Sequence, residues 1–482
     1  MDAETLYSLC KRRGFLWPTA ELYGGLSGFY DYGHLGARMK RNWEDLWLDY
    51  FLGLSDNYYL LDTTNILPEA VLKASGHVKM FTDIMAVCKK CKNPTKTESL
   101  IEEALEKVED KTGINVDYTT PENIDKLISK FKIKCPTCGS VDNFEPSKPF
   151  HLMFPVSIGA TGEVKAYLRP ESAQGSYINF ANEFIACRRK LPLGLAIIGR
   201  VFRNEIAPRQ GFYRVREFVQ AELQIFFDPI DFEKHLNFDE VKNEKINVLF
   251  AESRGKFDYE PITASLLTTH NSLPPFYVYH MAKIQDFYLN ELKIPPEKFR
   301  FFEKTEKERA FYNKIHFDIE INFDSLGGFK EVAGLHYRTD YDLSRHQKES
   351  KQTLEVHWNN RKLIPHVLEL SFGVDRNIWA LLDVHFKRVG ERYVFQLPVK
   401  VAPYTVGIFP LMAKDNLDKK AYDIYQKLKK NGIHAFYDES GSIGKRYARM
   451  DEIGTPYCIT VDYESLEDQT VTIRDRNTMK QK

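Results

Sequence analysis

Two runs of apolar residues near the middle of the chain flank a short segment rich in Pro and Gly. The first run, Leu195 to Ile206, is apolar and β-branched, and the second, Phe212 to Phe227, alternates with a period of two. Between them, the sequence PRQG (208–211) has residues typical of a tight turn. The pattern therefore predicts an antiparallel β-hairpin.

The second run separates into two faces, because successive side chains of a strand point to opposite sides. One face is apolar apart from Glu217 and can enter a core. A charged strand face is ordinarily a solvated outer face of an antiparallel sheet. Here aromatic rings interleave with charges and amides, which favours the floor of a ligand site. The residues of this face are Phe212, Arg214, Arg216, Phe218, Gln220, Glu222, Gln224 and Phe226, and Arg203 and Glu205 share a face of the first strand.

Periodicity elsewhere predicts an α+β protein with a final α/β layer unit. Residues 77–150 and 230–315 differ in character and are predicted to be insertions, with helices over 98–109, 121–131 and 277–292. The main body is predicted to contain helices over 32–52 and 375–386 and strands over 58–67, 315–336 and 354–372. The final unit is predicted to alternate strands (404–409, 434–437, 456–461) with helices (416–430, 445–453).

Length and charge narrow the class of protein. At about 150 residues per domain, 482 residues indicate roughly three domains. Lys+Arg and Asp+Glu number 67 each, so the whole-chain charge does not indicate a nucleic-acid partner, and any such partner needs a local patch. The N-terminus does not resemble a signal peptide, and no apolar run approaches the roughly 18 residues of a membrane span. We therefore expect a soluble cytoplasmic protein without a membrane partner.

Four of the seven cysteines form two CxxC pairs, Cys88/Cys91 and Cys135/Cys138. Two such pairs supply the four thiolates that a tetrahedral structural Zn²⁺ needs, and Gly139 suits the tight turn of a zinc knuckle. The alternative is four reduced thiols that do not meet. Because two CxxC pairs seldom occur by chance, the sequence predicts a zinc site in the first insertion.

Several motifs in order resemble those of class II aminoacyl-tRNA synthetases. FRNE (202–205), the PRQG turn and VREFVQAE (215–222) resemble motif 2, SFGVDR (371–376) resembles motif 3, and the helix and strand ending at Pro68 resemble motif 1. Five further stretches resemble the α2-type glycyl-tRNA synthetases, and the zinc-knuckle insertion resembles their archaeal and eukaryotic branch. These stretches are GFYDYG (28–33), ASGH (74–77), RPESAQG (169–175), RTDYDL (338–343) and HVLELSFGVDR (366–376).

This resemblance covers nearly the whole chain and implies a function. The expected reaction is ATP-dependent ligation of glycine to tRNA(Gly) through a glycyl-adenylate intermediate, in a homodimer formed through motif 1. The implied domains are a class II catalytic core with an antiparallel sheet (1–76 and 151–392), the two insertions, and an anticodon-binding domain (396–482) that ends earlier than in the family. The implied motif ranges are about 35–68, 195–227 and 366–386.

The resemblance also assigns an ATP site that requires Mg²⁺. A guanidinium fork can match two phosphate oxygens, which suits Arg203 on the α-phosphate, with Arg376 as the second catalytic arginine. Phe218 is expected to stack on adenine, and Glu331 to bind Mg²⁺. Phe218 to Glu222 spans roughly 13 Å, about the distance from adenine to a group joined to the α-phosphate. The full expected ATP set is Arg203, Asn204, Glu205, Tyr213, Arg214, Val215, Phe218, Glu331, Val332, Gly373 and Arg376.

Glycine has no side chain to recognise, so a site specific for glycine must exclude larger amino acids. Three acids are expected to converge on the ammonium, while two polar residues crowd the α-carbon. For Glu171 the alternative is an exposed loop acid, whereas Glu369 would otherwise be a buried lone charge, which is costly. Lys96 stands where the family has an arginine near the glycine carboxylate. The expected glycine set is Lys96, Glu171, Phe218, Gln220, Glu222, Glu369 and Ser371.

Two other functions compete with this one. Another class II synthetase of the same subgroup would transfer proline, threonine, serine or histidine, but the three acids and RPESAQG favour glycine. A synthetase-like accessory protein that only binds nucleic acid would typically lack the phosphate arginines, and Arg203, Arg214 and Arg376 are all present. Between Lys414 and Arg449 nine basic and five acidic residues give a modest local excess that suits tRNA phosphates, although a solvated helix face has the same pattern.

Overall fold

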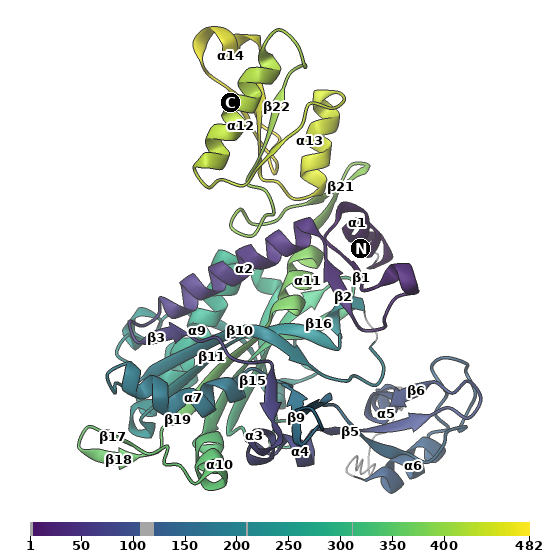
Figure 1. The fold of residues 1–482 in the computed structure, drawn as a ribbon, viewed down its shortest axis with the longest axis vertical. Coiled ribbons are helices and arrows are strands. Elements are labelled where there is room, and N and C mark those ends of the chain that lie inside the picture. The colour runs from purple at the N-terminus through teal and green to yellow at the C-terminus, as the bar shows by residue number, and fades with distance from the viewer. Residues whose placement is uncertain (1–2, 107–119, 209–210, 311) are drawn as a thin grey trace.

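A computed structural model describes residues 3–106, 120–208, 211–310 and 312–482. Its centre is a nine-stranded sheet in which the strand of motif 1 pairs with the hairpin of motif 2, and this hairpin pairs with the motif 3 strand from the second half of the chain (Figure 1). The pairing is antiparallel except at β10–β3 and β12–β14. The strand order is β13 (Glu260–Thr263), β12 (Lys245–Leu249), β14 (Phe299–Glu303), β15 (Ile315–Phe323), β16 (Gly328–Thr339), β19 (His366–Gly373), β11 (Glu217–Phe227), β10 (Leu193–Phe202) and β3 (Tyr58–Leu60).

Helices cover both faces of this sheet. Helices α2 (His34–Leu52), α9 (Pro275–Asp286) and α11 (Val374–Val384) bury one face in the largest apolar core, which contains Trp43, Trp47 and Phe372. Helix α7 (Ala173–Ala186) packs on the other face through Tyr177, Phe180 and Phe184, with Leu343 of α10 (Tyr341–Ser350) beside it. The predicted ligand face of β11 lies on the α7 side, because Phe226 belongs to that core.

The β10–β11 hairpin differs from the prediction at its connecting end. The strands pair from Leu193↔Phe226 to Phe202↔Glu217, and residues 203–208 and 211–216 are not strand. Phe212 and Tyr213 are both buried, and the Phe212 ring contacts Tyr30 and Tyr32 edge-on at 5.5 and 5.1 Å. The predicted alternation over 212–216 is therefore wrong, since aromatic packing replaces the strand. Residues 209–210 of the predicted turn lie outside the described residues.

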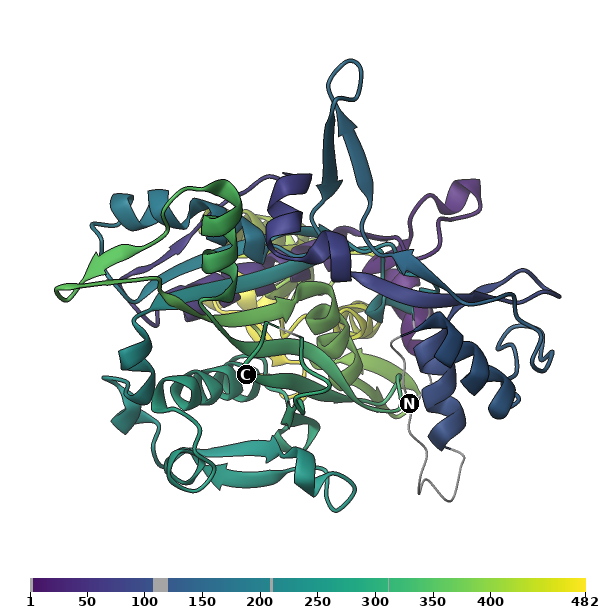
Figure 2. The same cartoon turned by 90° about the horizontal axis from the view of Figure 1, so that it is seen from below.

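The predicted strand over 58–67 is broken in two. Its second half, β4 (Ile66–Pro68), leaves the main sheet and pairs with β9 (Val164–Leu168), which pairs with β8 (Pro155–Ile158) in a hairpin that projects from the molecule (Figure 2). The other short elements of the body are α1 (Ala3–Arg13), β1 (Leu16–Pro18), β2 (Tyr30–Tyr32), α3 (Glu69–Ala74), α4 (His77–Met80), α8 (Ala264–Thr269), β17 (Val356–Trp358), β18 (Arg361–Leu363), β20 (Phe386–Val389) and β21 (Arg392–Phe395).

The two predicted insertions behave differently. The first has its own sheet and core, in which Ile101, Ile124 and Ile128 are buried. The second is continuous with the main sheet, to which it adds β12, β13 and β14, while α9 enters the main core. The first contains β5 (Thr82–Val87), β6 (Pro94–Lys96), α5 (Thr97–Glu106), α6 (Pro121–Lys130) and β7 (Lys148–His151). Residues 107–109 of the predicted helix lie outside the described residues.

The C-terminal unit is an α/β layer above the main body (Figure 1). It has a core of its own, and Phe409, Met450 and Ile453 join it to the main core. Its sheet has the order β23-β22-β24-β25, parallel except at β25. The alternation of strands and helices is as the sequence pattern predicts, with α14 and β25 in addition. The elements are β22 (Val406–Pro410), α12 (Leu417–Lys430), β23 (Ala435–Tyr437), α13 (Ile443–Glu452), β24 (Tyr457–Val461), α14 (Tyr463–Asp468) and β25 (Thr472–Asp475). Among the described helices of the whole chain, none is long and apolar enough to cross a membrane.

Candidate active site

A pocket opens where β11 and β19 meet the start of α11, beside the loop 203–216. It brings together eight residues that the sequence predicts for an ATP site and one, Asp375, that it does not. Three arginines face this small space, which suits a ligand with several negative charges. The residues that line it are Arg203, Glu205, Tyr213, Arg214, Val215, Phe218, Gly373, Asp375 and Arg376.

Arg203 is held between two aromatic rings. Its guanidinium carbon lies 5.4 Å from the ring centroid of Phe81 and 5.3 Å from that of Phe218. Its Nε donates to the carbonyl of Pro170 at 3.0 Å. In the described part of the chain no carboxylate is ion-paired with Arg203. The guanidinium is therefore oriented by its neighbours, while its terminal nitrogens stay available to an anion.

Arg376 and Glu331 form an ion pair on the other side of the pocket. Nη1 of Arg376 lies 3.1 Å from Oε1 of Glu331, and the guanidinium covers the Tyr213 ring at 4.7 Å. The Tyr213 hydroxyl donates to the Glu331 carbonyl at 2.7 Å. The Glu331 side chain remains 48% exposed, so its carboxylate is accessible. Val332 is buried in the core, so only its backbone can face a ligand.

The backbones of two further predicted ATP residues hold the loop in place. Asn204 donates its backbone N–H to the Leu152 carbonyl at 2.7 Å. The Glu205 carbonyl accepts from Nε and Nη2 of Arg216 at 3.0 and 2.8 Å. Arg216, which the strand pattern placed on the ligand face, therefore fixes the loop instead.

Asp375 was not assigned a role from the sequence, although it lies inside the SFGVDR motif. It is buried and accepts hydrogen bonds from the Tyr32 hydroxyl and from the backbone N–H of Val219, both at 2.6 Å. Burial raises the pKa of this carboxyl. Asp375 thereby ties the first turn of α11, and with it Arg376, to β2 and β11.

Further along β11, three predicted acids lie together in a buried cluster. The carboxylate of Glu222 accepts from the hydroxyls of Ser172 and Ser371, both at 2.7 Å. Gln220 accepts from the backbone N–H of Ser172 at 3.2 Å. Burial, with the neighbouring Glu369 and Glu171, raises the pKa of Glu222 to about 7. Among the described residues, no side chain forms an ion pair with this carboxylate.

The other two acids share a buried arginine that the sequence analysis missed. Arg338 is 1% exposed, donates to Glu369 and to Asp342, and lies 3.8 Å from Glu171. Burial alone would raise the pKa values of Glu171 and Glu369, but Arg338 and the neighbouring histidines hold both below the ordinary value. The sequence contained a signal for this arginine. Three converging buried carboxylates need a counter-charge, and the motif RTDYDL begins with Arg338.

Lys96 lies in the first insertion rather than in the acid cluster. Its Nζ is 3.0 Å from Asp83 and 3.1 Å from Glu98. Among the described residues, no hydrogen bond or ion pair joins Lys96 to another residue of the expected glycine set. The expected contact with a glycine carboxylate stays a prediction.

The four cysteines of the CxxC pairs meet in the first insertion. Their sulfurs lie within 4.8 Å of one another, with Cys88 Sγ 3.7 Å from Cys138 Sγ and Cys91 Sγ 3.6 Å from Cys135 Sγ. Four sulfurs at about 2.3 Å from a tetrahedral Zn²⁺ lie about 3.8 Å apart. The spacing therefore fits zinc. Gly139 has φ +70, as a knuckle turn requires.

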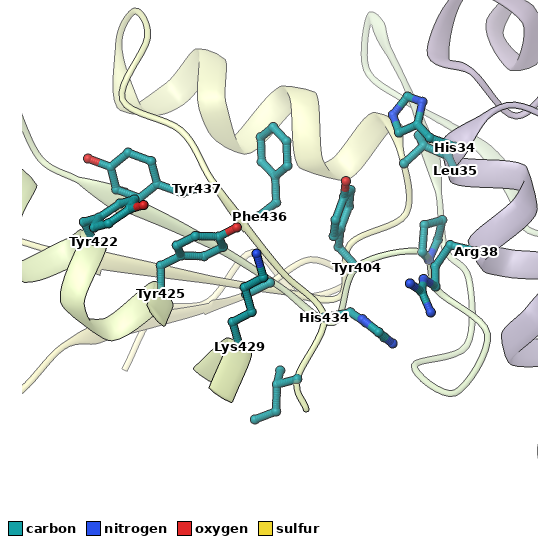
Figure 3. A pocket seen from close by; sticks show the side chains of 13 residues that line it. His34, Leu35, Arg38, Tyr404, Tyr422, Tyr425, Lys429, His434, Phe436 and Tyr437 are labelled. Atoms are coloured by element: carbon teal, nitrogen blue, oxygen red, sulfur yellow. The ribbon is translucent and has the colours of Figure 1, made fainter. Parts of the chain in front are cut away.

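A second, larger cleft of about 670 Å³ separates α2 from the C-terminal unit (Figure 3). Tyr422 and Tyr425 of α12 contact Tyr437 of β23 at 5.5 and 6.0 Å. Lys429 lies over the Tyr425 ring at 5.7 Å. Arg38 of α2 lines the opposite wall. Part of the basic excess predicted for this unit therefore faces the cleft.

Comparison with known proteins identifies two families along the chain. Residues 157–385 match the tRNA synthetase class II core domain (G, H, P, S and T), and residues 405–482 match an anticodon binding domain. The fold also resembles that of a prolyl-tRNA synthetase of Giardia lamblia solved with prolyl-adenylate, with a TM-score of 0.60 and 16% identity over 100% of this chain and 75% of that one.

Archaeal relatives are more similar to this chain in sequence than the prolyl-tRNA synthetase of Giardia lamblia is. The glycine–tRNA ligase of Thermococcus gammatolerans is 37% identical and that of Pyrococcus abyssi 38% identical, each over 99% of this chain and 95% of the relative. The resemblance noted in the sequence and the expected fold class are both confirmed. With a class II core, an anticodon-binding unit and this identity over nearly its full length, the chain belongs to the glycine–tRNA ligase family of class II aminoacyl-tRNA synthetases.

Proposed function

We infer that the protein joins glycine to tRNA(Gly) in two steps, as its family membership implies. Glycine first attacks the α-phosphate of ATP, which gives glycyl-adenylate and pyrophosphate. The glycyl group then passes to the terminal ribose of the tRNA. The observation that supports this assignment best is the continuity of β11, which leads from the arginine-lined pocket at Phe218 to the acid cluster at Glu222.

We propose that the arginine-lined pocket binds ATP. The position of Arg203 between two rings supports a role on the α-phosphate, where a rigid fork stabilises charge that develops in the transition state. Arg214 and Arg376 would hold the outer phosphates, and Phe218 would stack on adenine. Glu331 would hold Mg²⁺, which neutralises phosphate charge when it is bound. The glycine carboxylate is already ionised, so no general base is needed.

We propose that the acid cluster binds the glycine ammonium. Glu222 lacks an ion-pair partner among the described residues, whereas Glu171 and Glu369 already face Arg338. An ammonium group would supply the missing cation. An added methyl group is worth only about 1–3 kcal/mol in an ordinary pocket, so exclusion must come from close packing. Gln220 and Ser371 are placed to provide it, because both contact the groups around Glu222.

Three further assignments are part of this proposal. A Zn²⁺ ion at the four cysteines would stabilise the first insertion without taking part in the reaction, because four thiolates leave no open coordination position. The chain would act as a homodimer through the face formed by α2 and β3. The expected compartment is the cytoplasm, where glycyl-tRNA is used in protein synthesis.

ATP–pyrophosphate exchange across amino acids tests the proposed function. Exchange should depend on glycine and stay near background with proline, threonine, serine, histidine and alanine. Faster exchange with one of the other amino acids would favour a different member of the subgroup. Absence of exchange with every amino acid would favour the accessory protein that only binds nucleic acid.

A further inference from the structure

A row of ionisable side chains crosses the main sheet from the acid cluster. Glu369 of β19 pairs across the sheet with His336 of β16, which pairs with His316 of β15. Nδ1 of His336 lies 3.3 Å from Oε1 of Glu369, and its Nε2 lies 3.0 Å from Nε2 of His316. Nε2 of His316 is in turn 2.8 Å from Oδ1 of Asp318. The row ends at Lys304, whose Nζ is 3.3 Å from Asp318.

The sheet fixes this row in place. The side chains of His336 and His316 are only 15% and 13% exposed, and Glu369 is 4% exposed. Gly334, two residues before His336 and therefore on the same face of β16, makes room for the ring. A Cβ at Gly334 would lie 2.4 Å from Nε2 of His336. Nε2 of His336 is hydrogen-bonded to His316 outside the acid cluster, and its buried Nδ1 lies within ion-pair distance of Glu369 inside the cluster.

The row of side chains has two protonation states, which differ in the number of protons on His336. When His336 carries protons on both nitrogens, its Nδ1–H faces Glu369 and its Nε2–H donates to Nε2 of His316, which then cannot donate to Asp318. When His336 carries a proton on Nδ1 alone, Nε2 of His316 is the donor and faces His336 and Asp318. Burial would lower the pKa of His336, but the carboxylate of Glu369 outweighs it and raises the pKa. Burial and His336 lower the pKa of His316. His336 is therefore the histidine that takes the proton.

Titratable and charged groups face His336 from three strands, β19, β15 and its own strand β16. Glu369 faces it from β19, His316 and Asp318 face it from β15, and Arg338 lies on its own strand. A cation placed beside Glu369 would meet the charge of a protonated His336 at close range. Two like charges that share one carboxylate disfavour each other's binding.

We propose that His336, backed by His316, is a positioning residue for Glu369, and that its proton competes with the ammonium group of glycine. Glycine binding is thereby linked to the protonation of a histidine row that leads out of the active site. The inference rests on the proposed function, specifically on the place of Glu369 in the ammonium site. No residue of this row beyond Glu369 is assigned to the site by the sequence motifs.

Linkage gives the size of the effect. Each proton that must leave before glycine binds changes the KM for glycine tenfold per pH unit, at pH values where that group is protonated. Glu222, with its pKa of about 7, contributes one such proton. His336 contributes a second. In the wild-type protein the KM for glycine should therefore rise nearly a hundredfold for each unit of acidification below both pKa values.

The pH profile of His336→Gln tests the proposal. Glutamine can still donate one hydrogen bond to Glu369 but does not titrate. Measured in ATP–pyrophosphate exchange at pH values below both pKa values, the rise in the KM for glycine should fall from as much as a hundredfold to about tenfold per unit of acidification. The KM for ATP should keep its wild-type pH profile. His385→Gln is the matched control, because His385 is also buried but its Nε2 donates to the Leu292 carbonyl, away from the site.

A second variant tests the inference in case His336→Gln does not fold. His316→Ala removes the acceptor for the Nε2 proton of His336. The KM for glycine should then still depend on two protons, but the midpoint of its pH profile should move to lower pH. Imidazole NMR of the wild type should also show that glycine lowers the pKa of His336 and leaves that of His385 unchanged.

The results separate this inference from the proposed function. Superimposable profiles for the wild type and His336→Gln would overturn the inference, and so would a profile displaced equally at every pH, which a purely structural role produces. In both cases glycine-dependent exchange by the wild type would leave the proposed function standing. If the wild type shows no glycine-dependent exchange at any pH, the proposed function fails and this inference fails with it.

Discussion

At the scale of single residues, Arg203 is the side chain on which the proposed chemistry depends most. Replacing Arg203 by alanine should lower glycine-dependent ATP–pyrophosphate exchange by about a hundred- to a thousandfold, because a charge-stabilising donor in a dry site is worth about 3–4 kcal/mol. Arg203→Lys should recover little of this, since lysine lacks the planar fork. Steady-state exchange measures both variants.

Arg200→Ala is the control for Arg203. Arg200 lies near the end of β10, three residues before Arg203, but its side chain is exposed and forms an ion pair with Glu217 at the surface. Its loss should leave exchange within about twofold of wild type, because exposed ion pairs contribute little. An Arg203→Ala variant that keeps a tenth or more of the wild-type exchange would contradict the assignment of Arg203 to the α-phosphate.

Glu222 should show opposite effects on glycine binding and on stability. Glu222→Gln should raise the KM for glycine by about ten- to a hundredfold, since a hydrogen bond to a charged group is worth about 1.5–3 kcal/mol. The KM for ATP should not change. Because burial raises the pKa of Glu222 to about 7, its carboxyl favours the folded state below the unfolded pKa, and this contribution is lost as pH rises through 7.

The same substitution should therefore stabilise the empty protein above pH 7. A pKa raised from 4.5 to about 7 corresponds to on the order of 3 kcal/mol, and an uncharged glutamine avoids that cost. Denaturant unfolding of the wild type and Glu222→Gln at about pH 8 and about pH 5 measures the difference. Equal stabilities at both pH values, or an unchanged KM for glycine, would show that Glu222 is not a buried, unmatched carboxylate.

Sequence reasoning located the acids and the arginines of the site but not the residues that hold them. Glu222 and Phe218 could be placed together because alternation along one strand fixes their common face. Arg338, Asp375 and His336 could not, because each acts through a contact between distant segments. Arg338 joins β16 to Glu171 in the segment before α7, and Asp375 joins α11 to Tyr32. A pattern within one segment carries no information on such contacts.

At the scale of elements, the spacing of apolar residues along the chain predicted the bounds of several helices and strands to within a few residues. α12 was expected over 416–430 and spans Leu417–Lys430. The expectation was wrong over 212–216, where packing of Phe212 against Tyr30 and Tyr32 overrides an alternating pattern. It was also wrong over 58–67, because the segment leaves one sheet and joins another, which local alternation cannot indicate.

The first insertion should depend on metal for its stability. Its core is small and lies beside the four cysteines, so bound zinc would supply much of its folding free energy. We expect about one zinc ion per chain by elemental analysis of protein purified without chelators. Cys135→Ser should lose the metal and speed hydrogen exchange in residues 82–106 and 120–151 before it affects β10 and β11.

Cys187→Ser is the control for the zinc prediction, since Cys187 lies outside the cysteine cluster. It should keep the zinc content and exchange pattern of the wild type. Protein that contains no metal, yet shows full protection of the first insertion, would rule out a structural zinc site.

Helix α12 should contribute to tRNA binding rather than to amino-acid activation. Its last turn contains Lys427, Lys429 and Lys430, and Lys429 faces the cleft between the two parts of the molecule. Replacing all three by alanine should raise the KM for tRNA and reduce the salt dependence of binding, because fewer phosphate counterions are released. ATP–pyrophosphate exchange should not change. Lys480→Ala, a single basic change elsewhere in the same unit, is the control, and equal KM values for tRNA in all variants would exclude this role.

At the scale of the whole molecule, the main sheet has two free edges with different surroundings. β13 ends the sheet on the side of the second half of the chain, and β3 ends it beside α2. β3 is short, but Tyr59 and Leu60 on it are 39% and 55% exposed, and Ile66 just beyond is 39% exposed. An exposed apolar edge strand is a surface that proteins usually cover.

A second copy of the chain is the occupant that we expect at this edge, since the resemblance to motif 1 implies a dimer through the same helix and strand. The wild type should sediment at twice the mass of one chain. Leu60→Glu should shift it toward the monomer, because a charge would be buried without a partner in the interface. Leu22→Glu is the matched control: Leu22 is 90% exposed and lies in the segment between β1 and β2, on the other side of the main body from β3 (Figure 1), so this variant should stay dimeric. A wild type that sediments as a monomer at micromolar concentration, or a Leu22→Glu variant that dissociates as readily as Leu60→Glu, would exclude an interface at β3.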